Sequence, residues 1–163
     1  MAYDYHHNRD DRVYDPDRPE PIIWLLDPAR DALARVSYPL IRAATGLILV
    51  PHGAMKLFGG GLAGTAEFMA SQGLQPAYAL AVYIALLEFA GGLMMAAGLL
   101  TRLVAAQVVG FMAVAAFLVH WDNGFLWTAG GYEYPLYLGL VALAILFAGS
   151  GRWSLDRLIG REI

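Results

Sequence analysis

The chain of 163 residues is long enough for one compact domain. Hydrophobic residues make up 58% of it and charged residues only 15%, against roughly 25% charged residues in a typical soluble domain. A net charge of -3 without a basic stripe argues against a nucleic-acid partner, and the lack of cysteine excludes disulfides and Cys-ligated metals within this chain.

The first 37 residues precede the apolar part of the chain. Residues 1–21 are rich in proline and charge, which predicts a flexible charged arm that becomes ordered on a partner. Residues 22–37 begin with an apolar patch around Trp24. The Asp27-Pro28 pair then provides a cap and a first helical residue. We therefore expect 22–37 to contain a short helix at the membrane interface.

Four apolar stretches follow, at residues 38–58, 77–100, 103–121 and 134–149. Since a bilayer core of about 30 Å requires roughly 20 mainly apolar residues as helix, each stretch predicts a membrane span. A chain of this length cannot supply a polar shell around four such helices. The predicted fold is therefore an all-α integral membrane four-helix bundle over residues 38–149.

Two shorter segments outside the spans also have helical patterns. Residues 65–71, in the first long loop, predict a short helix whose Phe68 and Met69 dip into the outer leaflet. Residues 150–163 alternate apolar and charged side chains at helical spacing, which predicts an interfacial C-terminal segment.

The distribution of Lys and Arg predicts the orientation of the spans. Nine of these residues lie before the first span, between spans two and three, or after span four, whereas loops 59–76 and 122–133 contain none. Because basic residues favour the cytoplasmic side, both termini are predicted to be cytoplasmic.

Six ionisable residues lie inside the spans or at their ends. An ionisable group in the bilayer costs several kcal/mol unless it is paired or faces water, so such residues are functional candidates. They are Arg42, His52, Lys56, Glu88, His120 and Glu133.

The predicted depths of these residues indicate a pocket open to one side of the membrane. Arg42, His52 and Lys56 share a helix face within an arc of about 80°, so that face should point inward. His52, Lys56, His120 and Glu133 all fall in the outer half of the bundle, with Tyr132 near them. Pro51 should kink the helix beside His52 and open room for water or a ligand.

Structural roles are equally compatible with these positions. Arg42 and Glu88 could form an ion pair between helices, and Lys56 could extend to the outer surface. His52 and His120 could each bind a neighbouring carboxylate, and Glu133 could cap the fourth span. The two histidines on different helices also suggest a bis-His haem, but no supporting spacing motif accompanies them. We do not expect haem, and we expect no metal site.

Several motifs resemble those of the DoxX family. The first span contains Arg42-x3-Gly46 and His52-Gly53-x2-Lys56-Leu57-Phe58-Gly59-Gly60. The second contains Glu88-x2-Gly91-Gly92-Leu93, followed by Gly98-Leu99-Leu100-Thr101-Arg102. His120, Gly124-Phe125, Gly131-Tyr132-Glu133-Tyr134 and Gly149-x-Gly151-Arg152-Trp153-Ser154-Leu155-Asp156 complete the pattern in the same order. The resemblance covers about residues 38 to 160.

The resemblance implies a four-helix protein of the bacterial or archaeal cytoplasmic membrane. DoxX relatives have been linked to quinone-dependent respiratory oxidation, including thiosulfate:quinone oxidoreductase, and to membrane-bound oxidative-stress complexes. The family supplies no secure catalytic assignment. Its intramembrane polar residues correspond here only to the six ionisable positions named above.

Three functions are consistent with the sequence. The first is a quinone-linked redox subunit or membrane anchor of a larger complex. In it, His52, Glu88 and His120 are candidate catalytic groups for proton exchange. Arg42, Lys56, Tyr132 and Glu133 are candidate ligand-binding groups. The second is an accessory or assembly scaffold that binds protein partners but has no chemistry of its own. The third is a conduit for protons or small molecules.

Overall fold

The computed structural model describes the backbone of residues 27–160, and its described residues form helices and connecting loops without a strand. The predicted arm of residues 1–21 and the apolar patch of 22–26 lie outside the described residues. The chain divides into two compact units at Val36/Ser37. The arrangement described below concerns the second unit, residues 37–160. In the first unit, the structure describes only the start of helix α1.

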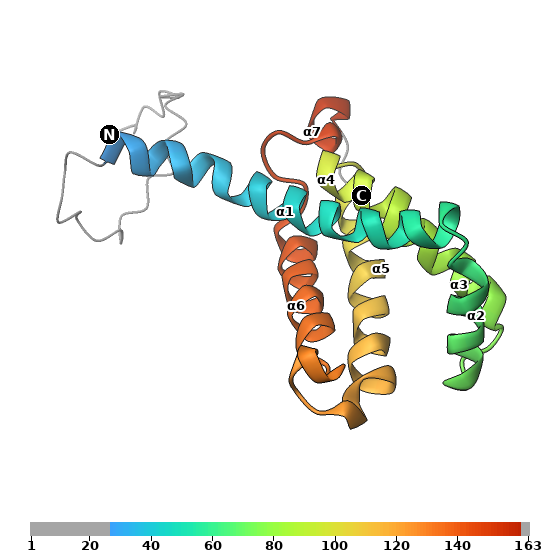
Figure 1. Ribbon diagram of the computed structural model, residues 1–163. Coiled ribbons are helices and arrows are strands. Elements are labelled where there is room, and N and C mark those ends of the chain that lie inside the picture. Colours follow the sequence, from blue (N-terminus) through green and yellow to red (C-terminus); the bar gives the residue numbers. More distant parts are fainter. Residues whose placement is uncertain (1–26, 161–163) are drawn as a thin grey trace, which may run out of the picture. The chain divides into compact units, whose positions relative to one another are not determined.

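Helix α1 runs without interruption from Asp27 to Phe58, through Pro39 and Pro51 (Figure 1). The segment expected as a separate interfacial helix is therefore continuous with the first predicted span. The elements that follow, with their bounds, are α2 (Leu62–Ser71), α3 (Ala77–Leu86), α4 (Gly92–Ala97), α5 (Thr101–Val114), α6 (Glu133–Ala148) and α7 (Leu155–Ile159).

Two π-helical segments interrupt this α-helical pattern. The segment η2 (Leu87–Gly91) joins α3 to α4, so that 77–97 is one continuous helical rod. The segment η3 (Ala115–Val119) extends α5 as far as His120. Two 3-10 turns, η4 (Trp121–Asn123) and η5 (Trp127–Ala129), form the loop before α6.

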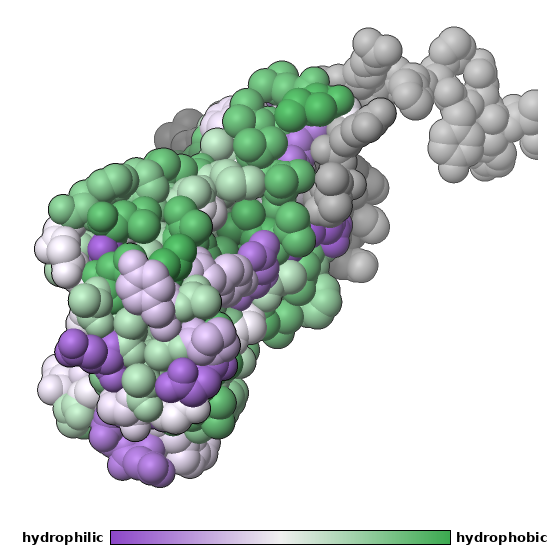
Figure 2. All heavy atoms as spheres, turned by 90° about the vertical axis from the view of Figure 1, so that its right-hand side faces the viewer, coloured by the Kyte–Doolittle hydropathy of each residue, from purple (hydrophilic) through white to green (hydrophobic). Residues whose placement is uncertain are grey.

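Three of these rods are long and apolar enough to cross a bilayer: Ala32–Phe58, Ala77–Ala97 and Thr101–Val119. The fourth predicted span corresponds to α6, which is apolar but has only 16 residues. At 1.5 Å per residue this gives about 24 Å, short of a bilayer core of about 30 Å. Many large apolar side chains are exposed, and hydrophobic residues cover most of the face shown in Figure 2. The chain is thus an all-helical membrane protein.

The core lies mainly between α5 and α6, which run side by side in Figure 1. Small residues alternate there with larger ones, so that the two helices interdigitate. The buried members of this cluster are Leu49, Leu87, Met95, Val104, Ala105, Val108, Met112, Leu138, Ala142 and Ile145. A second, smaller cluster around Met69 packs α2 against α3.

Helix α1 contacts the second rod through glycines. A methyl group at Gly46 would collide with the backbone of Gly92 and Ala96, and one at Gly53 would collide with the backbone of Phe89. Between helices in a membrane, where lipid is as apolar as leucine, such close backbone approach supplies much of the packing attraction. The glycines therefore determine how close α1 comes to η2 and α4.

We expect Gly46→Ala to lower the free energy of unfolding by about 1–3 kcal/mol, because the added carbon must push two backbones apart. Gly110→Ala, on α5, is the matched control, because its added carbon would meet nothing within 4 Å. Alanine favours helix over glycine, so the control should be neutral or slightly stabilising. Denaturant unfolding of the purified protein in detergent, followed by circular dichroism, measures both. Equal losses in the two variants would contradict the close approach.

Candidate functional site

A cavity of about 520 Å³ lies between α1, α2, η2, η3 and the start of α6. Most of its lining is apolar, including Leu49, Phe68, Ile84, Phe111 and Met112. Among the described residues, the ionisable and hydrogen-bonding side chains that line it are His52, Lys56, Thr65, Glu88, His120, Trp127 and Tyr134. Four of the seven candidate residues thus share one cavity, although they come from three separate helices.

Lys56 and Glu88 form an ion pair across this cavity, between α1 and η2. The side chain of Glu88 is 6% exposed and that of Lys56 is 21% exposed. Away from water each charge would lose its hydration, and the pair offsets part of that loss by mutual attraction. Lys56 therefore does more than extend to the surface. Glu88 forms its ion pair with Lys56 and not, as the sequence also allowed, with Arg42.

Both π-helical segments lie at the cavity wall. Glu88 is inside η2, and the amide of His120 closes η3 by donating to the carbonyl of Ala115 at 3.0 Å. A π turn inserts one residue into a helix, which rotates the following side chains and is frequent at functional sites. Two such turns lie on neighbouring rods. Each is beside an ionisable residue of the same cavity, which makes the cavity the candidate functional site.

His120 is held in a defined orientation. Its Nδ1 lies 2.8 Å from the carbonyl oxygen of Gly130, and its ring packs edge-on to Trp127 at 5.7 Å. A carbonyl oxygen only accepts hydrogen bonds, so Nδ1 carries the proton. In the neutral ring, Nε2 is then the nitrogen that can accept a proton.

His52 also lines the cavity, one turn before Lys56 on α1, but its residue surface is exposed. His52 therefore lies at the edge of the cavity, where α1 meets the outer surface of the protein. Gly53, next to it, is buried against Phe89, so the backbone on which His52 sits is tightly packed.

Glu133 and Tyr132 do not line the cavity and belong instead to the loop beside it. A carboxylate oxygen of Glu133 accepts from the amide of Trp127 at 3.1 Å. The Tyr132 ring stacks on Trp121, with centroids 4.6 Å apart and planes 18° apart. Both residues thus organise the loop that carries Trp127, a residue that does line the cavity.

Arg42 is also absent from the cavity and lies among the loops that follow α4 and α6. Its guanidinium donates to the carbonyl oxygens of Ser150, Trp153 (2.9 Å) and Ala96 (3.4 Å). The side chain is 2% exposed, so this buried charge is compensated by backbone carbonyls rather than by Glu88. Tyr38, one turn earlier, donates to the carbonyl of Gly149 in the same way.

Asp156 is the main residue that sequence reasoning missed. We expected it on the polar face of an interfacial segment, but it is buried and caps α5. Its carboxylate accepts from the amides of Leu100 (2.7 Å) and Thr101 (3.0 Å) and from the Thr101 hydroxyl (2.9 Å). A carboxylate at a helix N-terminus satisfies otherwise unpaired amides. The sequence did contain both partners of this contact, Thr101 and Asp156, in two motifs 55 residues apart, but nothing in the sequence paired them.

Comparisons with known proteins show the family of the chain. The DoxX family model matches residues 38–121, a range that includes Arg42, His52, Lys56, Glu88 and His120. The chain belongs to the DoxX family.

Two curated relatives match more than half of the chain. The chain is 37% identical over 109 residues to the "Inner membrane protein YqjF" of Escherichia coli, covering 63% of this chain and 77% of that protein. It is 32% identical over 117 residues to the "Putative oxidoreductase CatD" of Bacillus subtilis, covering 72% of this chain and 82% of that protein. No solved structure matches the chain.

The side chains that line the cavity are chemically varied. Within residues 27–160, no three His, Asp or Glu side chains gather closely enough to hold a metal ion. The cavity instead combines one cation, one carboxylate, two imidazoles and a phenol in apolar walls. Such a set can donate to carbonyl oxygens and exchange protons with hydroxyl groups.

Removing one member of the ion pair should leave the other charge uncompensated. We expect Glu88→Gln to lower the free energy of unfolding by about 3–5 kcal/mol, as for other buried pairs broken on one side. The double variant Lys56→Met with Glu88→Gln should lose less than the sum of the single variants, because neither charge remains. Glu67→Gln, an exposed carboxylate on α2, is the control and should change little. Additive losses in this double-mutant cycle would contradict a direct pair.

A second prediction concerns Arg42, which does not line the cavity and is expected to contribute to stability rather than to ligand binding. Each hydrogen bond from a charged donor contributes about 1.5–3 kcal/mol, and lysine cannot present the same fork to three carbonyls. We expect Arg42→Lys to lower the melting temperature of the purified protein markedly, with Arg35→Lys, an exposed arginine of α1, as the unchanged control. A variant as stable as wild type would show that these carbonyl contacts contribute little.

Proposed function

We propose that this DoxX-family chain is a quinone-linked redox subunit of a respiratory or oxidative-stress membrane complex, and that the cavity around Lys56 and Glu88 binds the quinone headgroup. The single observation that carries the proposal is the pairing of an acid and a base inside a mainly apolar cavity, with His120 in the same wall. The name "Putative oxidoreductase" of the CatD relative supports the same class of function.

The size and lining of the cavity fit a quinone headgroup. Small-molecule sites commonly measure about 300–1,000 Å³ and combine apolar walls with a few placed polar groups. The 520 Å³ found here falls in that range, and Phe68, Phe111 and Trp127 offer flat apolar surfaces. A bound quinone supplies two-electron chemistry that consumes two protons on reduction.

The chain's own residues would handle binding and protons. Lys56 is a donor for a carbonyl oxygen, and its ion pair with Glu88 holds its ammonium group at the cavity. His120 presents one protonated nitrogen to Gly130, which leaves Nε2 for proton exchange. His52 lines the same cavity from α1 and is a second candidate for proton exchange with the ligand. The electrons come from a partner subunit in this proposal, since no redox group is formed by the described residues.

Quinone binding tests the proposal directly. We expect a short-chain quinone to bind the purified protein in nanodiscs, with its dissociation constant raised at least tenfold in Glu88→Gln and in Tyr134→Phe. Glu67→Gln and Tyr83→Phe are the matched controls, because these two side chains do not line the cavity. Equilibrium binding of a radiolabelled quinone provides the measurement.

The same variants should then be compared in membranes containing the native complex. Quinone reduction should fall in Glu88→Gln and persist in Glu67→Gln. Unchanged binding and unchanged turnover in both cavity variants would overturn the proposal and leave the role of an accessory scaffold.

A further inference from the structure

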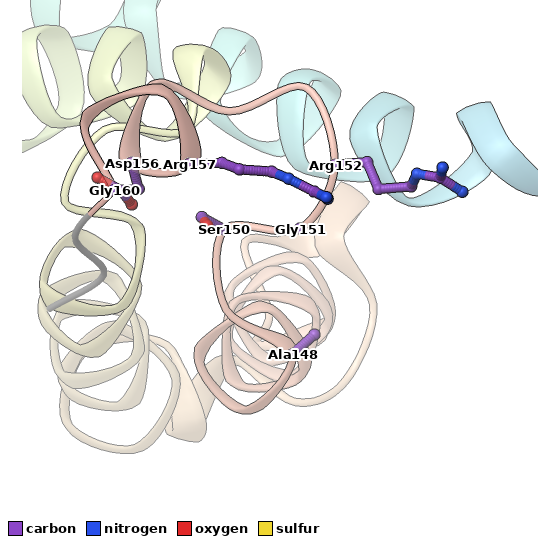
Figure 3. Close-up of a pocket in the computed structure, with 7 residues that line it drawn as sticks. All are labelled: Ala148, Ser150, Gly151, Arg152, Asp156, Arg157 and Gly160. Atoms are coloured by element: carbon purple, nitrogen blue, oxygen red, sulfur yellow. The ribbon is translucent and has the colours of Figure 1, made fainter. Parts of the chain in front are cut away.

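A second pocket, of about 460 Å³, lies where the chain leaves α6 and enters α7. It is lined by Ala148, Ser150, Gly151, Arg152, Asp156, Arg157 and Gly160 (Figure 3). Its walls are more polar than those of the first cavity, and the two pockets share no lining residue. Nothing in the proposed quinone chemistry uses it.

Arg157 brings a positive charge to this pocket. Figure 3 shows its side chain extending from α7 across the pocket, above the loop of Ser150 and Gly151. Its guanidinium forms no hydrogen bond or ion pair with the residues that the structure describes. Asp156, adjacent in sequence, also lines the pocket, and its carboxylate accepts from the backbone amides at the start of α5. Arg152 at the rim adds a second positive charge.

The loop under the pocket is held in place by contacts from below. Tyr38 donates to the carbonyl of Gly149, Arg42 donates to that of Ser150, and the hydroxyl of Ser154 donates to that of Gly151 at 3.0 Å. These bonds fix three consecutive carbonyls of the loop. The floor of the pocket is therefore formed before any ligand arrives, which lowers the entropic cost of binding.

The position of the pocket indicates the membrane surface. It lies beside the ends of three apolar helices: α4 ends at Ala97, α5 begins at Thr101, and α6 ends at Ala148. Next to it, Trp153 is 68% exposed and Leu158 is 83% exposed. Large apolar side chains in a short helix at this level are typical of a segment lying in the interface, with its apolar groups at the acyl boundary.

We propose that this pocket binds the phosphate group of an anionic phospholipid. The guanidinium fork of Arg157 matches two phosphate oxygens, and the hydroxyl of Ser150 adds polar lining. The acyl chains would continue along Trp153 and Leu158. The excess of positive charge favours a headgroup with net negative charge over a zwitterionic one, whose ammonium group would meet the arginines.

Lipid binding to the full-length protein tests this assignment. Protein purified in neutral detergent is titrated with phosphatidylglycerol, phosphatidylcholine or inorganic phosphate, and bound lipid is counted by native mass spectrometry. We expect one tightly bound phosphatidylglycerol and at least tenfold weaker binding of phosphatidylcholine. Arg157→Gln should weaken phosphatidylglycerol at least tenfold, and Arg157→Lys, which keeps the charge without the fork, should fall between it and wild type.

Arg35→Gln is the matched control, because it removes the same charge from an exposed arginine that does not line the pocket. An equal loss in Arg35→Gln would overturn the site in favour of general charge attraction. Unchanged phosphatidylglycerol binding in Arg157→Gln would overturn it as well. Inorganic phosphate that binds as tightly as the lipid would reassign the pocket to a free anion. Because quinone binding is measured at the other cavity, its failure would not affect this result.

Discussion

A charged side chain placed between apolar helices must find its partner within the protein, because neither lipid nor a close-packed core can replace its hydration. This DoxX chain meets the requirement in two ways. Lys56 and Glu88 neutralise each other across the cavity, whereas Arg42 is compensated by backbone carbonyls of distant loops. The ion pair is partly exposed to the cavity, so its charges remain available to a ligand. Arg42 is buried, and the contacts described for it are with backbone carbonyls that hold the loops in place.

The close approach of α1 to the second rod makes the ion pair possible. Gly46 and Gly53 allow the two backbones to touch, and Lys56 lies three residues beyond Gly53. The π turn that contains Glu88 then directs the carboxylate toward α1. A cavity of about 520 Å³ remains where η3 ends beside His120. Packing by glycine and irregular helix geometry thus combine to keep reactive groups near one another in apolar surroundings.

The loops after α4 and α6 form the other organised region. Arg42, Asp156 and Tyr38 bind backbone groups there rather than one another, and together they fix the start of α5 and the turn into α7. The Asp156 carboxylate is bound to the start of α5, and Arg157 and Arg152 bring two positive charges to the lining of the second pocket. The two pockets therefore have different chemistry: one balances acid and base, and the other is positively charged.

The sequence by itself determined that this is a helical membrane protein of the DoxX family, and it placed six ionisable residues in or beside the apolar helices. Those properties depend on local composition and on ordered motifs. Only the tertiary structure decided which partners these residues have. Lys56 rather than Arg42 meets Glu88, and Asp156 reaches Thr101 across 55 residues of sequence. Helical periodicity specifies a face but not the rotation and spacing of one helix against another. Contacts among glycine backbones set that geometry, and a single sequence shows the glycines but not which backbone each one meets.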